Sequence, residues 1–181
     1  NLAKDYSLDI FFSALDKKSY FKLREFGINK IKLPSTISNK KDYLELVAKD
    51  PTDEIIISTG MTDQSYIDFI VHNFKDVKKL YLLHCISSYP TFYRDTNLAI
   101  IKNYDHISKK YGNIIPGYSS HDIGSVASMM AIAMGARMIE KHIKFGITPW
   151  AHFDDTAMDV VSEFPSYVKS VRSAEELIGS D

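Results

Sequence analysis

Residues 114–143 read IIPGYSSHDIGSVASMMAIAMGARMIEKHI and contain a complete strand–helix–strand unit. The apolar run at 114–120 predicts a strand, and residues 125–134 predict a helix that Gly135 is placed to end. A second short run, at 136–143, predicts another strand. Two strands joined through a helix are parallel, with a right-handed crossover between them. This stretch therefore predicts an α/β fold.

The same unit recurs along the whole chain, without a linker that would divide it. The predicted strands are short and almost continuously apolar, as in sheets covered on both faces. They occupy residues 8–13, 28–33, 54–59, 79–85, 114–120 and 136–143. The predicted helices occupy residues 17–26, 41–48, 64–73, 97–111, 125–134 and 161–177. About six βα units in one domain over residues 1–181 can form an open doubly wound sheet or most of an eight-unit barrel, and periodicity alone does not choose.

Composition narrows the class of protein. The chain has 181 residues, 45% hydrophobic and 25% charged, with a formal net charge of -1. A near-neutral chain has no general attraction for nucleic acid or for an anionic membrane, so we expect neither as a partner. The longest apolar stretch is too short to span a bilayer. A lone cysteine, Cys85, excludes an internal disulfide and reads as a buried structural thiol, so we expect a cytoplasmic protein.

Polar residues gather where the predicted strands end. The carboxyl ends of parallel strands carry the active site in α/β folds, whether the sheet is open or closed. A serine in such a place is often only a helix cap, and a lone histidine is often hydrogen-bonded structure. Polar residues at the carboxyl ends of consecutive strands, however, favour an active site there. The residues concerned are Ser13, Lys32, Ser35, Ser58, Thr59, His84, Ser87, Ser88, Ser119, His121, Glu140 and His142.

Two histidines end neighbouring strands of the predicted sheet. Alternation along a strand puts Glu140 and His142 on one face and Lys141 on the other. His121 and His142, with a carboxylate or with waters, can hold a divalent ion such as Mn²⁺. Glu140 can ligate such an ion, orient a ligand or move a proton. A satisfied structural polar pair remains the alternative.

The strand ends also offer donors for an anion. Hydroxyls, an amide and an ammonium suit phosphate or carboxylate oxygens, and helix N-termini add positive potential. The chain has neither a GxGxxG fingerprint after its first strand nor a GxxxxGK[ST] loop, so dinucleotide and P-loop binding are not indicated. Ordinary capping is the alternative. The candidate donors are Lys32, Ser35, Ser58, Thr59, Ser87, Ser88, Asn97 and Ser119.

A polar loop, TPWAHFDDTAMD at residues 148–159, follows the last of these strands. Its tryptophan, Trp150, is placed either to cover a site or to plug the end of a barrel. Asp154 and Asp155 read either as capping residues or as a further site carboxylate. The sequence leaves both choices open.

In their order, several phrases resemble the sialic acid synthase family, which includes N-acetylneuraminate, legionaminic acid and pseudaminic acid synthases. They are FSALD, KIKLPS, IISTGM, LLHCISSYPTFYRDTNL, the 117–143 stretch and HFDDTAMD. The resemblance implies a (β/α)₈ TIM barrel with its site at the carboxyl-terminal mouth. It places the first residues at the family's third strand, so we expect a partial barrel without the family's first two βα units and without its antifreeze-like domain.

Matched residue by residue, the resemblance implies roles for particular side chains. The family's metal-binding histidines fall on His121 and His142, and its site glutamate falls on Glu140. Its sugar-handling aspartate falls on Asp154, although an ungapped count lands on Phe153. Its acidic residue two places after the Ser35 position is replaced by Ile37. Its phosphoenolpyruvate contacts fall on Lys32, Ser35, Ser58, Asn97 and Ser119, and the hydroxyl of Ser87 is a further candidate substrate donor.

The activity implied is that of a transferase of sialic acid biosynthesis. A Mn²⁺- or Mg²⁺-dependent enzyme would condense phosphoenolpyruvate with N-acetylmannosamine or a related amino sugar, giving a nonulosonic acid and phosphate. Unpaired sheet edges further favour a homo-oligomer, which we expect to be a dimer. One alternative is a non-catalytic sugar- or partner-binding module of a polysaccharide pathway. Another is a metal-dependent barrel lyase or aldolase that forms a Schiff base through Lys32.

Overall fold

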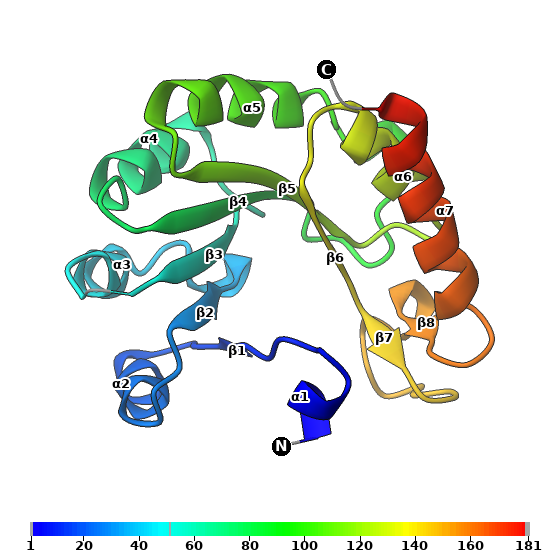
Figure 1. The fold of residues 1–181 in the computed structure, drawn as a ribbon, viewed down its shortest axis with the longest axis horizontal. Helices are drawn as coiled ribbons and strands as arrows, with labels where there is room; N and C mark the ends of the chain where they lie inside the picture. Colours follow the sequence, from blue (N-terminus) through cyan, green and yellow to red (C-terminus); the bar gives the residue numbers. More distant parts are fainter. Residues whose placement is uncertain (1, 51, 180–181) are drawn as a thin grey trace.

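The computed structural model describes residues 2–50 and 52–179 and confirms the α/β class (Figure 1). Six parallel strands, paired in chain order, form one curled sheet that resembles part of a barrel, with helices on its outer side. The strands are β1 Phe12–Ser13, β2 Lys30–Leu33, β3 Glu54–Ser58, β4 Lys79–Cys85, β5 Ile114–Ser120 and β6 Met138–Lys141. Strands β1 and β6 are the two edges of this sheet.

The predicted helices are all present, some with shifted ends. They are α2 Lys17–Glu25, α3 Lys41–Ala48, α4 Gln64–Asn73, α5 Ile100–Tyr111, α6 Val126–Ala133 and α7 Phe164–Ile178, with a short α1 at Leu2–Asp5. Helix α5 begins three residues later than predicted, since Asn97 has a φ of +46°, outside the helical region. Among the described residues, none of the helices has both the length and the apolar character needed to cross a membrane.

Strand β3 shows why the sheet forms. Ile55, Ile56 and Ile57 are all fully buried, because helices cover one face and the barrel interior the other. Ile55 and Ile57 belong to the core between the sheet and the helices. On the inner face, β4 and β5 approach closely: a Cβ built on Gly117 would lie 2.3 Å from Cδ2 of Leu83. Glycine is therefore required there.

The strand predicted at 136–143 is wrong in its extent. Strand β6 ends at Lys141, and a separate two-stranded parallel sheet pairs β7, Ile143–Lys144, with β8, Met158–Asp159. The amide of Met158 donates to the carbonyl of His142 at 2.9 Å. The chain therefore leaves the large sheet at His142 to pair with a segment that alternation along 136–143 could not reveal.

Candidate active site

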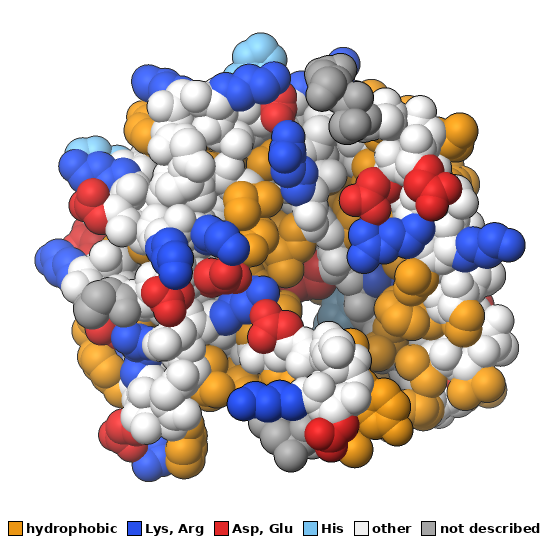
Figure 2. All heavy atoms as spheres, in the orientation of Figure 1, with side chains coloured by type: hydrophobic (Ala, Val, Ile, Leu, Met, Phe, Trp, Pro, Cys, Tyr) orange, Lys and Arg blue, Asp and Glu red, His pale blue; other side chains and the backbone are white. Residues whose placement is uncertain are grey.

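The carboxyl ends of the strands enclose a cavity of about 490 Å³, here called the strand-end pocket. In Figure 2 the molecule is hollowed near its centre, with acidic and histidine side chains visible at depth. Of the predicted site residues, the structure places in its lining Ser13, Lys32, Ser35, Ser58, Ser87, Ser119, His121, Glu140 and His142. These residues come from β1 through β6 and the segments that follow them. The folding of the sheet therefore brings together residues more than 100 positions apart.

A buried ion pair crosses the pocket between strands that are far apart in the sheet. The ammonium of Lys32, whose side chain is 5% exposed, donates to both carboxylate oxygens of Glu140. The hydroxyl of Ser119 donates to Oε1 of the same carboxylate at 2.7 Å. Burial alone would raise the pKa of Glu140, but the Lys32 ammonium and the Ser119 hydrogen bond outweigh it and hold that pKa below its ordinary value. Glu140 is therefore ionised at neutral pH.

The two histidines lie side by side next to this pair. The rings of His121 and His142 stack with centroids 5.4 Å apart. Nδ1 of His121 lies 2.7 Å from the carbonyl of Ile86, which can only accept, so Nδ1 carries the proton and Nε2 is left as an acceptor. Burial lowers the pKa of both imidazoles. Both are therefore neutral at pH 7, the form that binds a metal ion.

Hydroxyls line the side of the pocket near β2 and β3. Oγ of Ser58 is buried and has no hydrogen-bond partner among the described residues. Oγ of Ser35 accepts the amide of Gly60 at 2.8 Å, which leaves its own proton free to be donated. A Cβ built on Gly60 would lie 2.2 Å from Oγ of Ser87 and 2.7 Å from Oγ of Ser35. The glycine thus keeps open a small cradle of hydroxyls suited to an anion's oxygens.

Asn97 and Asp154 lie outside the pocket lining, as do Thr59, His84 and Ser88 of the predicted strand-end set. Asn97 is exposed in the turn before α5. The carboxylate of Asp154 accepts the amide of Thr148 at 2.7 Å and the ammonium of Lys144 at 2.9 Å, so it holds its own loop. Trp150 is 83% exposed and neither lines the pocket nor plugs the sheet. Roles for Asn97 and Asp154 in substrate binding stay predictions.

Three aromatic residues beside the histidines were missed or left without a role by sequence reasoning. The ring of Tyr89 lies 4.0 Å from that of His121, between centroids, and 4.9 Å from that of His152. The ring of Phe153 stacks on His142 at 4.8 Å with an interplanar angle of 10°. The signals in the sequence were the SSYP phrase that follows β4 and the HFDDTAMD phrase, since loop residues carry no periodicity.

The histidine pair can be compared with what a metal ion requires. Among the described residues, no group of three or more His, Cys, Asp and Glu side chains has the arrangement of a metal site. Two neutral imidazoles, one with its tautomer fixed by a backbone carbonyl, nevertheless suit a divalent ion such as Mn²⁺. His121 and His142 would then supply two ligands, and water or substrate oxygens the others.

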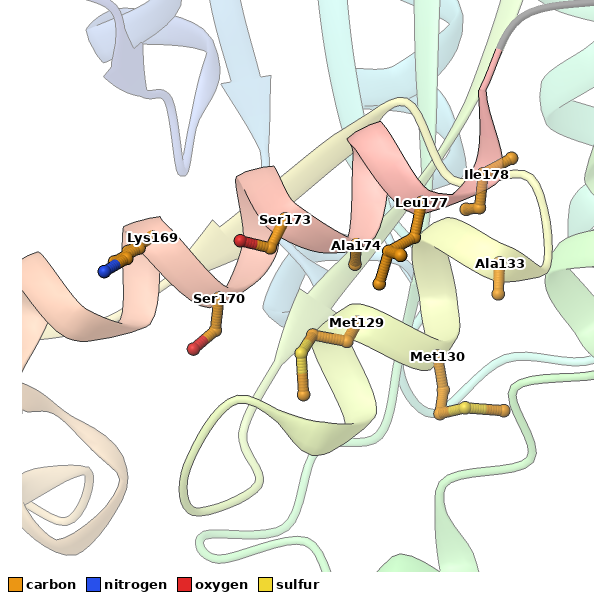
Figure 3. Close-up of a pocket in the computed structure, with 9 residues that line it drawn as sticks. All are labelled: Met129, Met130, Ala133, Lys169, Ser170, Ser173, Ala174, Leu177 and Ile178. Atoms are coloured by element: carbon orange, nitrogen blue, oxygen red, sulfur yellow. The ribbon is translucent and has the colours of Figure 1, made fainter.

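A second cavity, of about 460 Å³, lies on the outer side of the molecule between α6 and α7 (Figure 3). Apolar side chains, including Met129, Met130 and Leu177, line much of it. It contains no carboxylate and no imidazole. The carboxylate and imidazole groups described above therefore belong to the strand-end pocket and not to this outer cavity.

Comparison with known proteins identifies relatives over the whole chain. The model of the NeuB family matches residues 1–181. The pseudaminic acid synthase of Campylobacter jejuni is 33% identical over 181 residues, covering 98% of this chain and 50% of that protein. The N-acetylneuraminate-9-phosphate synthase of Homo sapiens is 33% identical, covering 94% of this chain and 47% of that protein.

A solved structure gives the same fold. The N-acetylneuraminic acid synthetase of Leptospira borgpetersenii, in complex with citrate, superposes with a TM-score of 0.86 at 27% identity. The match covers 98% of this chain and 61% of that chain. This chain spans about half the length of the curated relatives it matches. The curled sheet is therefore the barrel architecture of these neighbours.

Proposed function

This chain belongs to the NeuB family, and from that membership we propose that it carries the strand-end site of a transferase of sialic-type acid synthesis. The proposed reaction joins phosphoenolpyruvate to an N-acetylated amino sugar such as N-acetylmannosamine, giving a nonulosonic acid and phosphate. One observation carries the proposal: the buried, unpartnered hydroxyl of Ser58 lies in one pocket with the buried ammonium of Lys32. Phosphoenolpyruvate supplies the oxygens that both groups need.

Binding of the anionic substrate falls to the β2 and β3 side of the pocket. Lys32 places a positive charge there, and Ser35, Ser58 and Ser87 offer hydroxyl donors around the Gly60 cradle. Charge-assisted hydrogen bonds to phosphate or carboxylate are stronger than neutral ones. Nζ of Lys32 already donates to both carboxylate oxygens of Glu140, so it is engaged in that contact and not free to attack a carbonyl carbon. This favours binding over Schiff-base chemistry at Lys32.

The bonds that form and break in the proposed reaction require a proton acceptor, a role that we propose for Glu140. C3 of phosphoenolpyruvate forms a bond to the aldehyde carbon of the open-chain sugar, whose oxygen takes up a proton and becomes a hydroxyl, and water adds at C2. The C2–O bond then breaks, and phosphate leaves with its electron pair. The ionised carboxylate of Glu140, a third exposed, is placed to accept the proton of that water. Ser119 fixes its orientation through Oε1.

The histidines take the part of the pocket near the sugar aldehyde. His121 and His142 would hold a Mn²⁺ or Mg²⁺ ion through ring nitrogens, and Ile86 keeps the first of them in the required tautomer. A divalent ion supplies Lewis-acid polarisation of a carbonyl oxygen. We extend the proposal to a cytoplasmic homo-oligomer, with phosphoenolpyruvate and the amino sugar as partners.

The test is phosphate release from phosphoenolpyruvate by the protein at its native length, with Mn²⁺ and candidate N-acetylated sugars. Release should require both the sugar and the ion, and mass spectrometry should find the sugar extended by three carbons. Ser58→Ala should raise the KM for phosphoenolpyruvate, whereas Ser170→Ala, on the outer helix α7, should not. A folded protein that binds a sugar but releases no phosphate with any candidate would instead support the non-catalytic module.

A further inference from the structure

Between the site residues of β5 and β6 lie side chains that point to the other face of the sheet. Ser119, His121, Glu140 and His142 line the pocket. Lys141, between the last two, also borders the pocket, but its Nζ donates to Oγ of Ser120 at 3.0 Å and to the carbonyl of Asp122. Lys141, next to His142, is therefore hydrogen-bonded to Ser120 and Asp122, the two neighbours of His121.

These residues form one buried network. The carboxylate oxygen Oδ1 of Asp122 accepts the hydroxyl of Ser120 at 2.6 Å and that of Tyr118 at 2.9 Å. Asp122 is fully buried, and Ser120 and Tyr118 are 1% exposed. The Lys141 ammonium also lies 6.0 Å from the ring centroid of Tyr167 on α7. Oδ2 of Asp122 is buried without a hydrogen-bond partner among the described residues, so the hydrogen bonds of this network are those to Oδ1 and those of Lys141. Buried hydrogen bonds of this kind restrict the arrangement of the backbone segments that they join.

Backbone hydrogen bonds hold the two histidines to different segments, with the carbonyl of His121 accepting the amide of Thr91 and that of His142 accepting the amide of Met158. Pairing of β5 with β6 ends at Ser120 and Lys141. His121 and His142 follow directly, beyond the last paired residues of the two strands. Next to that last pair, Nζ of Lys141 adds two hydrogen bonds between the segments, to the carbonyl of Asp122 and to Oγ of Ser120.

We infer that Lys141 is a positioning residue, whose ammonium ties the end of β6 to residues 120–122 and so sets the spacing of the two pocket histidines. The inference rests on the proposed function in one respect, the assignment of a divalent ion to His121 and His142. Second-layer groups that orient metal ligands commonly change metal affinity 10- to 100-fold when removed. Here the network would orient the two histidines through their backbone, without contacting the imidazole rings.

The test measures Mn²⁺ affinity by electron paramagnetic resonance and, without metal, the imidazole ¹⁵N shifts of the two histidines. Lys141→Met, which keeps length and removes the donors, should weaken Mn²⁺ binding about 10- to 100-fold and move both sets of shifts. Ser120→Ala, which removes one acceptor, should change both readouts in the same direction by less. Lys169→Met, exposed on α7, is the control and should leave both readouts at the wild-type values.

Unchanged affinity and unchanged imidazole shifts in Lys141→Met or in Ser120→Ala would overturn the inference, whatever the unfolding midpoint does. If Lys141→Met does not fold, Ser120→Ala alone decides by the same criterion. Failure of the divalent-ion assignment, the one part of the proposed function used here, is distinguishable, because wild-type protein would then bind no Mn²⁺ at these histidines. The metal-free imidazole shifts would still test the positioning role in that case.

Discussion

Replacing Glu140 by glutamine leaves the ammonium of Lys32 without a countercharge where its side chain is only 5% exposed. Removing one partner of a buried ion pair costs about 3–5 kcal/mol, because the remaining charge stays desolvated. The reverse change, Lys32→Met, leaves a carboxylate that is a third exposed and still accepts Ser119. We expect the smaller loss of about 1–3 kcal/mol there.

The double variant should be less destabilised than the sum of the two single variants. Once both charges are gone, neither is left buried alone, so the coupling should be about 1–3 kcal/mol. Urea unfolding at pH 7.5, followed by far-ultraviolet circular dichroism, measures all four free energies. In a domain of this size each kcal/mol corresponds to a shift of roughly 2–4 °C in Tm.

Lys17→Met is the matched control, since Lys17 pairs with Asp42 at 2.8 Å but both side chains are largely exposed. Its effect should stay within about 0.5 kcal/mol of zero. The reasoning is refuted if Glu140→Gln lowers the free energy of unfolding by no more than this control does. It is also refuted if the effects of the changes at Lys32 and Glu140 add without coupling.

Four further outcomes are expected. Mn²⁺ binding, measured by titration calorimetry, should persist below pH 6.5 and be lost only on further acidification. Burial lowers the pKa of His121 and His142, so protons compete less well with the metal ion for the imidazoles. Loss of binding above pH 7 would contradict this. Hydrogen bonds from the loop hold the pKa of Asp154 at about 2, so the stability it contributes is present above about pH 4 and is lost toward pH 2, and the gap in unfolding free energy between wild type and Asp154→Asn should close across that window. Gly117→Ala should cost about 1–3 kcal/mol in urea unfolding, because the new methyl meets Leu83; a neutral change would show that the strands can separate. Size-exclusion chromatography should show an oligomer, since β1 and β6 each have an unpaired edge, and a well-behaved monomer would count against that expectation.

Local signals explain the parts of the fold that sequence predicted well. Helix α4 begins and ends where expected because Asp63 caps it, accepting the amide of Tyr66 at 3.1 Å, and its apolar residues face the core. Strand β3 is an isoleucine run bounded by polar residues. Alternation also predicted that Glu140 and His142 share a face, since that depends only on neighbouring residues.

Long-range contacts explain what the sequence did not predict. The break at His142 comes from pairing between β7 and β8, which are separated by a loop. The place of Tyr89 over His121 depends on the loop after β4, whose Thr91 amide donates to the carbonyl of His121 at 2.9 Å. The carboxylate of Asp154 accepts a hydrogen bond from Thr148 of its own loop, a contact that no spacing rule indicates. The family resemblance named residues for the site, but their distances required the folded chain.

The hydroxyl of Ser58, which has no hydrogen-bond partner among the described residues, lowers the stability of the folded protein but offers a donor to a ligand. A buried polar group without a partner raises the free energy of the folded protein by about 1–3 kcal/mol, and a ligand oxygen that accepts its hydrogen bond recovers part of that. An alanine at this position should therefore give a chain at least as stable as the original and a weaker grip on the anion. Selection for thermal stability alone would discard this serine, and the proposed binding of an anion at this hydroxyl would explain its presence in an otherwise apolar strand.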